Sequence, residues 1–240
     1  MTPSLVAAAA RPEDLLDDER GLAWLTPGEL RQWAALASPL RSEYLAAHLL
    51  VRVCAATLMG ISPQTVSVHQ SCAECGAEGH GRPLTAEQPD VYLSLAHTDG
   101  MVAAAASLHQ HCGIDVEPER LLSTRVAERF LTPSEMASAR HEGTSPMTYW
   151  RRKEALAKAG FGTLTGLFRI DTSHVRNAVL RVRDGVHQQR FRLWEITMTG
   201  LAVCLVSADL KAKCTWLEAE QARAALRYPS RTSCQDPTRA

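Results

Sequence analysis

The chain has 240 residues, which is enough for one large domain or two small ones with a core of ordinary size. Hydrophobic residues make up 45% and charged residues 22%, the composition of a folded globular protein and not of a disordered chain. The 26 basic and 26 acidic side chains balance. Composition therefore gives no support to a general nucleic-acid-binding surface or to a surface for anionic membranes.

The cysteines and the N-terminus indicate a cellular compartment. The seven cysteines are odd in number, and several, such as Cys54, Cys112 and Cys204, lie in apolar context. This pattern favours reduced thiols in a cytosolic protein over a disulfide framework. The apolar run LVAAAA at residues 5–10 is followed at once by Arg11, and it is too short for a signal peptide or a membrane span. We therefore expect a soluble cytoplasmic protein.

Two helices are expected near the N-terminus. Residues 26–36 begin with Thr26 at the N-cap, a proline at the next position and Glu29 three residues after the cap, which is a strong helix start. Residues 40–60 have apolar side chains along one stripe and end in Gly60, so they predict a long helix.

Strand patterns follow in the middle of the chain. Residues 66–70 predict a strand, and residues 72–83 predict a loop because they are rich in glycine. Residues 91–97 and 101–107 are joined by a turn at residues 98–100, and together they predict a strand hairpin.

The second part of the chain again combines helical and strand patterns. Helices are expected at residues 134–142 and 145–162, the second with a proline in its first turn and two glycines at its end. The further expected elements are strands at residues 167–172, 179–185, 188–196 and 201–209 and a last helix at residues 218–227.

A short internal repeat relates the two parts of the chain. GMVAAAAS at residues 100–107 and GLAVCLVS at residues 200–207 both run from a glycine through six apolar residues to a serine. The sequence therefore predicts an α+β fold with two similar α+β halves in a pseudo-twofold arrangement. We assign residues 1–112 to the first half, residues 113–228 to the second half and residues 229–240 to a disordered polar tail.

The stretch GIDVE at residues 113–117 carries two carboxylates on a predicted strand. Because side chains alternate along a strand, Asp115 and Glu117 share one face while Ile114 and Val116 point the other way. Two like charges at this spacing repel each other, and a dry site increases the cost. A positive group should therefore lie opposite this face.

The segment WRRKEALAK at residues 150–158 supplies that positive charge. Glu154 and Lys158 are four residues apart and share one stripe of a helix, with Lys153 beside them. Three carboxylates without a Cys or His ligand suit Mg²⁺, and lysines beside such a metal suit a polyphosphate. The alternative is that Glu154 and Lys158 form only an exposed ion pair and that the acid pair is a solvated strand face.

These motifs together resemble the 4′-phosphopantetheinyl transferases of the surfactin-synthetase-activating type. The resemblance rests on GIDVE, on RVAERFLTPSE at residues 125–135, and on WRRKEALAK followed by a GFG turn. Upstream, HGRP at residues 80–83 and SLAHTDG at residues 94–100 resemble two further motifs of that family, and LLVR at residues 49–52 also fits. The resemblance spans roughly residues 26–207.

The resemblance implies a role for each matching residue. Asp115, Glu117 and Glu154 would form a Mg²⁺ site, and Glu154 would also be the general base. Lys158 would stabilise the pyrophosphate and its leaving group. The other implied contacts with coenzyme A are Lys153 and His97 at its phosphates, Gly81, Arg82 and Pro83 at its adenine end, and Arg41 at its 3′-phosphate.

The implied reaction is transfer of the 4′-phosphopantetheine group of coenzyme A to a serine of an apo acyl or peptidyl carrier protein, with release of 3′,5′-ADP. Such an enzyme serves natural product biosynthesis, and no nucleic-acid or membrane partner is expected. One chain supplies both halves of the cleft, so a monomer is expected. The carrier is expected to dock on an apolar patch with scattered arginines, such as Arg125 and Arg129 with Phe130 or Leu131.

Departures from the family pattern keep a second hypothesis open. Arg82 replaces the usual lysine, Ala96 replaces the usual serine before the histidine, and Asp99 puts an acid close to a phosphate-binding turn. Ala96 and Asp99 would fit a degenerate module that binds coenzyme A or a carrier protein without transferring the group. The intact acid and lysine set argues against that alternative.

A third hypothesis is a zinc-stabilised interaction protein. Cys72 and Cys75 form a CxxC pair with His80 nearby, which resembles half of a zinc site. The alternative is a loop with reduced thiols. The side chains that would complete a zinc site, if they fold nearby, are Cys112, His109 and His111.

Overall fold

The computed structural model describes residues 3–71, 76, 81–85, 88–118, 123–162, 166–184, 187–198 and 201–227. The predicted disordered tail and the Cys72, Cys75 and His80 group lie outside these residues.

The described chain forms strands, α-helices and short 3₁₀ helices. The strands are β1 (Leu5–Ala10), β2 (Val68–Ser71), β3 (Arg82–Thr85), β4 (Val91–Thr98), β5 (Met101–Leu108), β6 (Cys112–Pro118), β7 (Val175–Arg176), β8 (Val179–Asp184), β9 (His187–Met198), β10 (Leu201–Ser207) and β11 (Cys214–Leu217). The helices are α1 (Pro12–Leu15), α2 (Pro27–Ala35), α3 (Ser38–Met59), α4 (Thr124–Ala127), α5 (Pro133–Glu142), α6 (Pro146–Lys158) and α7 (Ala219–Leu226), with 3₁₀ helices η1 (Glu19–Trp24), η2 (Pro63–Thr65) and η3 (Leu167–Arg169).

The strands form two sheets of the same plan. The first sheet has the order β11-β1-β5-β4-β3-β2 and the second has the order β6-β10-β9-β8-β7. Without β11, the first sheet takes its five strands in the same relative order as the second, and each contains an antiparallel hairpin, β4–β5 or β9–β10, beside its first strand. This confirms the prediction of an α+β fold with two similar halves.

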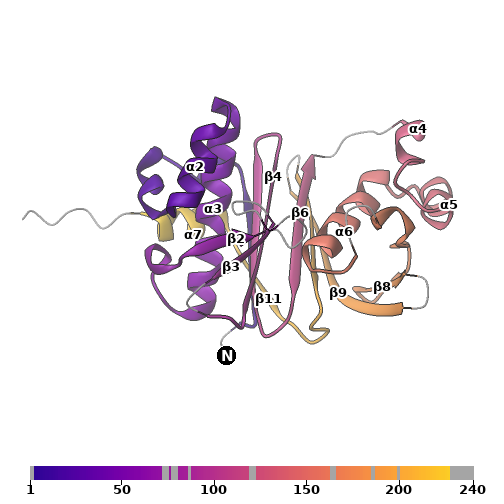
Figure 1. The fold of residues 1–240 in the computed structure, drawn as a ribbon. Coiled ribbons are helices and arrows are strands. Elements are labelled where there is room, and N and C mark those ends of the chain that lie inside the picture. The colour runs from indigo at the N-terminus through magenta and orange to yellow at the C-terminus, as the bar shows by residue number, and fades with distance from the viewer. Residues whose placement is uncertain are drawn as a thin grey trace, which may run out of the picture.

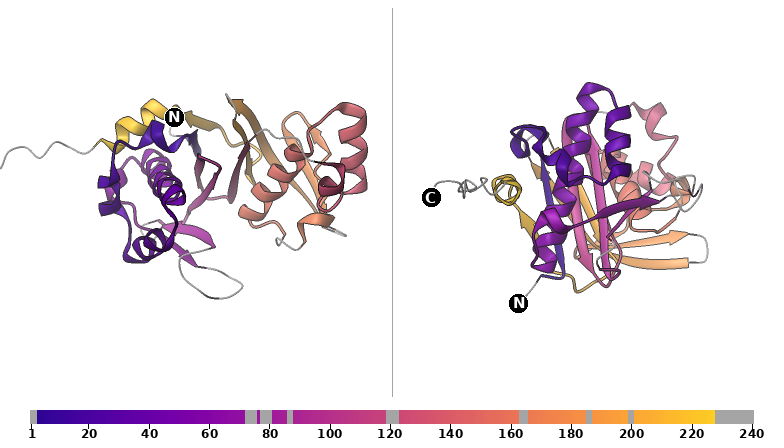
Figure 2. Two further views of the ribbon diagram at one scale, coloured as in Figure 1. Left: turned by 90° about the horizontal axis from the view of Figure 1, so that it is seen from above. Right: turned by 60° about the vertical axis from the view of Figure 1, so that its left-hand side comes forward.

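The two sheets face each other between two helical layers (Figure 1). The helix α3 packs on one side against β1, β4 and β5, and α6 packs on the other side against β6 and β10. The inner faces meet in an apolar cluster to which β1 and β5 contribute mainly alanines, while β6 contributes Ile114 and Val116. Small side chains on one sheet therefore make room for branched ones on the other. Figure 2 shows the same layers from above.

The strand β1 was missed by the sequence analysis, which treated residues 5–10 only as an apolar run. All six residues of β1 are buried, because α3 covers one face and the second sheet covers the other. A strand that is buried on both faces shows no alternation of apolar and polar residues. Alanine also has a low intrinsic preference for strands, so neither usual signal was present.

A buried charge network fixes α2 on α3. The capping box of Thr26 and Glu29 forms as predicted. The Glu29 carboxylate lies 2.6 Å from His48 Nδ1 and accepts a hydrogen bond of 2.6 Å from Arg52 Nη2, whose side chain is fully buried. Burial opposes the charge of Glu29, but the hydrogen bonds from His48 and Arg52 outweigh burial and lower the pKa of Glu29 to about 2.

The segment at residues 167–172 corrects one prediction. It was expected to be a strand, but residues 167–169 form the 3₁₀ helix η3. Leu167 and Ile170 are both buried under α6, while Phe168 is 46% exposed. The buried positions are therefore three residues apart, which suits a 3₁₀ turn and not the two-residue period of a strand.

Two other boundaries also differ from the expected ones. The helix expected at residues 145–162 ends at Lys158, because Gly160 and Gly162 both adopt positive φ angles, +85° and +81°, which end the helix. Arg82 and Pro83 were expected in a loop, but they belong to β3, where they pair with β2.

The halves are not strictly consecutive in the chain. The strand β6 begins at Cys112, but β11 and α7 return to the first sheet, where β11 pairs parallel with β1 and α7 packs against α1 and α3. The division of the chain at residues 112 and 113 stays a prediction, and residues 214–226 lie with the first sheet although they follow the second.

Gly113 allows α6 to lie directly on β6. A Cβ atom at this position would overlap the backbone carbonyl oxygen of Ala155 and would lie 2.6 Å from the nitrogen of Ala159. Both clashing atoms belong to the helix backbone, which cannot move aside as a flexible side chain can. Glycine therefore sets the distance between the helix and the strand.

We predict that Glu29 makes folding sensitive to acid. Its pKa in the folded protein, about 2, lies below its ordinary value of 4.5, so its contribution is complete above pH 4.5 and is lost as the pH falls towards 2. The expected loss is about 3 kcal/mol. Urea unfolding of wild type and Glu29→Gln across this range should show a smaller pH dependence for the variant. Parallel curves would contradict the prediction.

We predict that Gly113→Ala destabilises the protein by about 3 kcal/mol, because α6 must move away from β6. Urea unfolding measures this loss. The matched control is Gly28→Ala, where the nearest atom to an added Cβ is 3.8 Å away, and there stability should stay equal or rise. Equal stability for Gly113→Ala would show that the helix and the strand are not held at this distance.

Candidate active site

The strand β6 divides its side chains between two layers. Ile114 and Val116 point into the apolar cluster between the sheets. Asp115 lies opposite Cys204 of β10, which packs in the cluster under α6, so Asp115 and Glu117 face the helix. The alternation in GIDVE therefore places both carboxylates beside α6, as the sequence predicts for a strand.

Lys158 at the end of α6 pairs with Asp115. Its Nζ atom lies 2.7 Å from Asp115 Oδ1, and its side chain is 29% exposed while that of Asp115 is 7% exposed. The second carboxylate oxygen, Asp115 Oδ2, is buried and has no hydrogen-bond partner among the described residues. A buried acceptor of this kind needs a cation or a donor that the described residues do not supply.

Glu154 lies one turn before Lys158 on α6, where the charges of the strand carboxylates Asp115 and Glu117 act on it. Burial raises the pKa of Glu154, Lys158 opposes the rise, and the charges of Asp115 and Glu117 add to it. The charges of Asp115 and Glu117 therefore act on Glu154, and Lys158 offsets part of their effect. This is the electrostatic pattern of a site that is completed by a cation.

The residues present fit a divalent metal. Asp115, Glu117 and Glu154 supply oxygen ligands, which Mg²⁺ prefers, and Asp115 Oδ2 is an acceptor still to be satisfied. No group of three or more acidic, His or Cys side chains is already gathered as a metal site in the described parts of the chain. Lys158 instead pairs with the Asp115 carboxylate. The metal site is therefore a prediction from the ligand chemistry of these side chains, because the ligands are not already gathered around one point.

Arg82 is brought to the same end of α6 from the first sheet. Its Nη1 atom lies 3.1 Å from His111 Nδ1, and burial together with the nearby Arg82 charge lowers the pKa of His111. Gly160 lies directly beside the Arg82 guanidinium, so that even a methyl group there would clash with it. Arg82 therefore lies near Lys158 across the boundary of the halves. Gly81 and Pro83 flank it on β3 and the preceding turn.

His97 lies at the end of β4 and contacts an acid that sequence reasoning missed. The His97 Nδ1 atom is 3.4 Å from Glu43 Oε2, and Glu43 Oε1 accepts a 2.6 Å hydrogen bond from the backbone nitrogen of Gly100. Glu43 is buried on α3. It therefore holds the hairpin turn and the histidine together, and no local pattern in the sequence indicates this contact.

The unexpected Asp99 has a structural explanation. Asp99 and Gly100 have φ angles of +43° and +79° and form the two-residue turn between β4 and β5, with Thr98 paired to Met101. An Asp-Gly pair is among the best sequences for such a turn. The geometry of the hairpin therefore accounts for Asp99, which weakens one of the two arguments for a degenerate site.

Lys153 and Arg41, two of the predicted coenzyme contacts, are engaged by groups of the protein itself. Lys153 is fully buried, donates one 2.8 Å hydrogen bond to the carbonyl oxygen of Phe130 and pairs with Glu135 at 2.8 Å, so it is not brought to the carboxylate cluster. Arg41 donates to the carbonyl oxygens of Ala34 and Leu36 and thereby caps the end of α2. Helical adjacency to Glu154 suggested Lys153, but neighbouring residues on a helix point in different directions.

The expected carrier-docking patch is wrong in its apolar part. Phe130 and Leu131 are only 8% and 7% exposed, and they pack with Tyr149 in a small cluster of their own. Arg125 and Arg129 are exposed. The apolar side chain that is exposed on α4 is Val126, at 44%.

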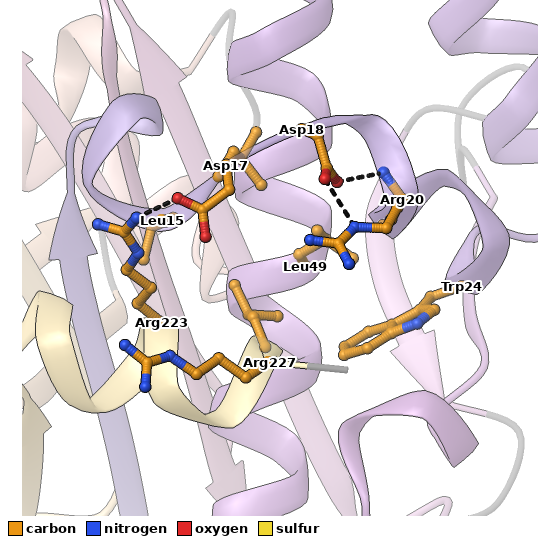
Figure 3. A pocket seen from close by; sticks show the side chains of 11 residues that line it. Leu15, Asp17, Asp18, Arg20, Trp24, Leu49, Arg223 and Arg227 are labelled. Carbon is orange, nitrogen blue, oxygen red and sulfur yellow. Dashed lines mark hydrogen bonds and ion pairs between the residues drawn. The ribbon is translucent and has the colours of Figure 1, made fainter. Parts of the chain in front are cut away.

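A separate hollow of about 390 Å³ lies between η1, α3 and α7 (Figure 3). Its charged side chains are largely paired with each other: Asp17 with Arg223 and Asp18 with Arg20. Leu49 forms part of its floor. None of the predicted site residues lines it, so it does not belong to the carboxylate cluster.

Residues 111–206 match the model of a family described as the 4′-phosphopantetheinyl transferase superfamily. The matched stretch contains the carboxylate cluster and Lys158, and it leaves out Arg41, His97 and residues 81–83. No curated protein matches the chain. Among the helices of the described residues, none has the length and apolar character needed to cross a membrane. The part of the chain that builds the candidate active site is therefore similar in sequence to phosphopantetheinyl transferases.

Proposed function

We propose that this protein transfers the 4′-phosphopantetheine group of coenzyme A to a serine of an apo acyl or peptidyl carrier protein and releases 3′,5′-ADP. The observation that carries the proposal is the group of Asp115, Glu117 and Glu154 around Lys158, within the stretch that matches the transferase superfamily. The proposal includes the surfactin-synthetase-activating type, a Mg²⁺ requirement and a monomeric, cytoplasmic enzyme of natural product biosynthesis.

The carboxylates and Lys158 have different proposed roles: the acids bind the metal, and Lys158 stabilises the leaving group. Asp115, Glu117 and Glu154 would hold Mg²⁺, which when bound neutralises charge on phosphoryl oxygens. Lys158 is partly exposed and carries a mobile point charge, so it stabilises the negative charge that develops on the departing 3′,5′-ADP. Its pairing with Asp115 keeps the ammonium group at the site before the substrate arrives.

Glu154 is the proposed general base. The serine oxygen of the carrier attacks the phosphorus that bears the pantetheine arm, and the bond from this phosphorus to the 3′,5′-ADP oxygen breaks, leaving its electron pair on that oxygen. The serine proton passes to Glu154. A raised pKa makes Glu154 a stronger base than an ordinary glutamate, and burial is the main cause of the rise.

The first half of the chain supplies the proposed coenzyme contacts. Arg82 of β3 lies beside Gly160, just past the end of α6. Together with Gly81 and Pro83, it is proposed to hold the adenine end of coenzyme A. His97 is proposed to contact the phosphates, in competition with its present partner Glu43. Arg41 is proposed to contact the 3′-phosphate, although its guanidinium already donates to two backbone carbonyl oxygens. Lys153 is not included, because it is buried in an ion pair.

The second candidate function is a module that binds coenzyme A or a carrier without transfer. The observation in its favour is Ala96, which is buried and has no hydroxyl where the family pattern has a serine. The contact of Glu43 with His97 does not separate the two functions, because a carboxylate at this histidine opposes an anionic ligand in both.

One experiment separates the two functions. Apo carrier proteins of the fatty-acid, polyketide and peptide types are incubated with the protein and coenzyme A, with and without Mg²⁺, and their intact masses are measured. A gain of one phosphopantetheine that depends on the metal supports the transferase. No gain with any carrier, together with measurable coenzyme A binding, supports the binding module.

We predict that Glu154→Gln lowers turnover by at least about a hundredfold while the protein stays folded, because the variant cannot accept the serine proton. Initial rates are measured by carrier mass, and folding is measured by thermal unfolding. The control is Glu142→Gln, an exposed glutamate at the end of α5, which should keep the wild-type rate. Full activity of a folded Glu154→Gln would remove Glu154 from this role.

A further inference from the structure

The second sheet carries arginines on the face that points away from α6. Phe191 and Leu193 of β9 belong to the cluster under α6, so the alternating residues Arg190 and Arg192 lie on the opposite face. The strand β8 alternates in the same way, which places Arg181 on that face too. Figure 1 shows β8 and β9 farther from the first sheet than β6 is.

Two of these arginines face each other across neighbouring strands. Arg181 is the direct cross-strand partner of Arg190, and both side chains are exposed. Like charges directly opposite each other destabilise an antiparallel pair. Within the described residues, no carboxylate forms an ion pair with either guanidinium. The fold therefore carries an uncompensated cost at this position.

Two further arginines extend the positive surface. Arg176 on the edge strand β7 is exposed. Arg192 lies over the Trp194 ring at 5.7 Å and donates a hydrogen bond of 3.4 Å to the carbonyl oxygen of Asn177, while its Nε atom is buried and has no hydrogen-bond partner among the described residues. We name Arg176, Arg181, Arg190 and Arg192 the arginine face.

Two open hollows adjoin the arginine face. One, of about 580 Å³, includes Arg181 and Arg190, and the other, of about 540 Å³, includes Arg176 and Arg181. Arg181 and Gln188 line both, so the hollows are neighbours. The acid in the second hollow, Asp171, is engaged by Ser173 and lies 3.6 Å from His174. The surface thus offers guanidinium groups beside an amide side chain able to bond a peptide backbone.

We propose that the arginine face binds an extended, acidic protein segment. Guanidinium groups pair with carboxylates in a planar, two-point geometry, and adjacent hollows suit the successive side chains of an extended peptide. A nucleic acid fits less well, because single-strand binding surfaces combine basic groups with aromatic stacking rings, and neither hollow is lined by Phe, Tyr or Trp among the described residues. The ring beside the arginine face, Trp194, already has the Arg192 guanidinium over it. The chain as a whole is also neutral.

This surface is distinct from the proposed transferase site. Asp115 and Lys158 lie on the α6 side of the second sheet, whereas the arginine face lies on the other side. Arg181 and Arg190 repel each other and thereby lower the stability of the sheet. Residues that conflict with the stability of the fold in this way concentrate at functional surfaces. The proposal therefore does not depend on the transferase activity.

The test uses the full chain and a fluorescein-labelled peptide of alternating glutamate and glycine, about twelve residues long, a length typical of peptide motifs. Fluorescence anisotropy measures binding at low and at physiological salt. Arg181→Glu should weaken binding by at least about tenfold, because it removes one cation and adds an anion. The same substitution should raise the urea midpoint of unfolding, because it turns the repulsive pair with Arg190 into an attractive one. Loss of binding with a gain of stability is the expected signature.

The control is Arg31→Glu, which makes the same change of charge on an exposed position of α2 in the first half. Its binding should stay within about twofold of wild type, since distant exposed charges are screened by salt. Equal weakening by both variants, or no weakening by Arg181→Glu, would overturn the proposal. Tighter binding of a single-stranded oligonucleotide than of the acidic peptide would overturn the assignment of a protein partner. A fall in the urea midpoint of Arg181→Glu would overturn the argument from repulsion.

Discussion

At Gly113 the backbone of β6 lies against the backbone of α6 at Ala155 and Ala159, with no side chain between them. This contact brings Lys158 within 2.7 Å of Asp115 and puts Glu154 in the field of the strand carboxylates. A longer distance between helix and strand would leave the same residues as separate surface charges, worth little to one another in water. The candidate site thus depends on one close approach.

The carboxylates at that contact are only partly satisfied by the described residues. Lys158 pairs with Asp115 Oδ1, while Asp115 Oδ2 is buried without a hydrogen-bond partner among the described residues. Such an arrangement costs free energy until a cation completes it. Burial also raises the pKa of Glu154, and the charges of Asp115 and Glu117 add to the rise. The basicity proposed for Glu154 therefore has the same origin as the cost of placing these acids together.

The second sheet presents different chemistry on its two faces. The face under α6 carries acids near the helix end, and the other face is apolar where it meets the first sheet and basic where β8 and β9 extend away from it. The duplicated plan makes this possible, because only the inner strands of each sheet are needed to close the core. The outer strands remain available for other contacts: Arg82 on β3 reaches the end of α6, and Arg181 on β8 faces solvent.

The sequence alone determined features that depend on neighbouring residues: the capping box at Thr26, the alternation in GIDVE, and the four-residue spacing of Glu154 and Lys158. Local patterns suffice there because the interacting groups are fixed by one helix or one strand. The burial of Lys153, the doubly covered strand β1 and the pairing of Arg181 with Arg190 were decided only by the tertiary structure. Each depends on which distant segment packs or pairs opposite, and no residue nearby in the chain carries that information.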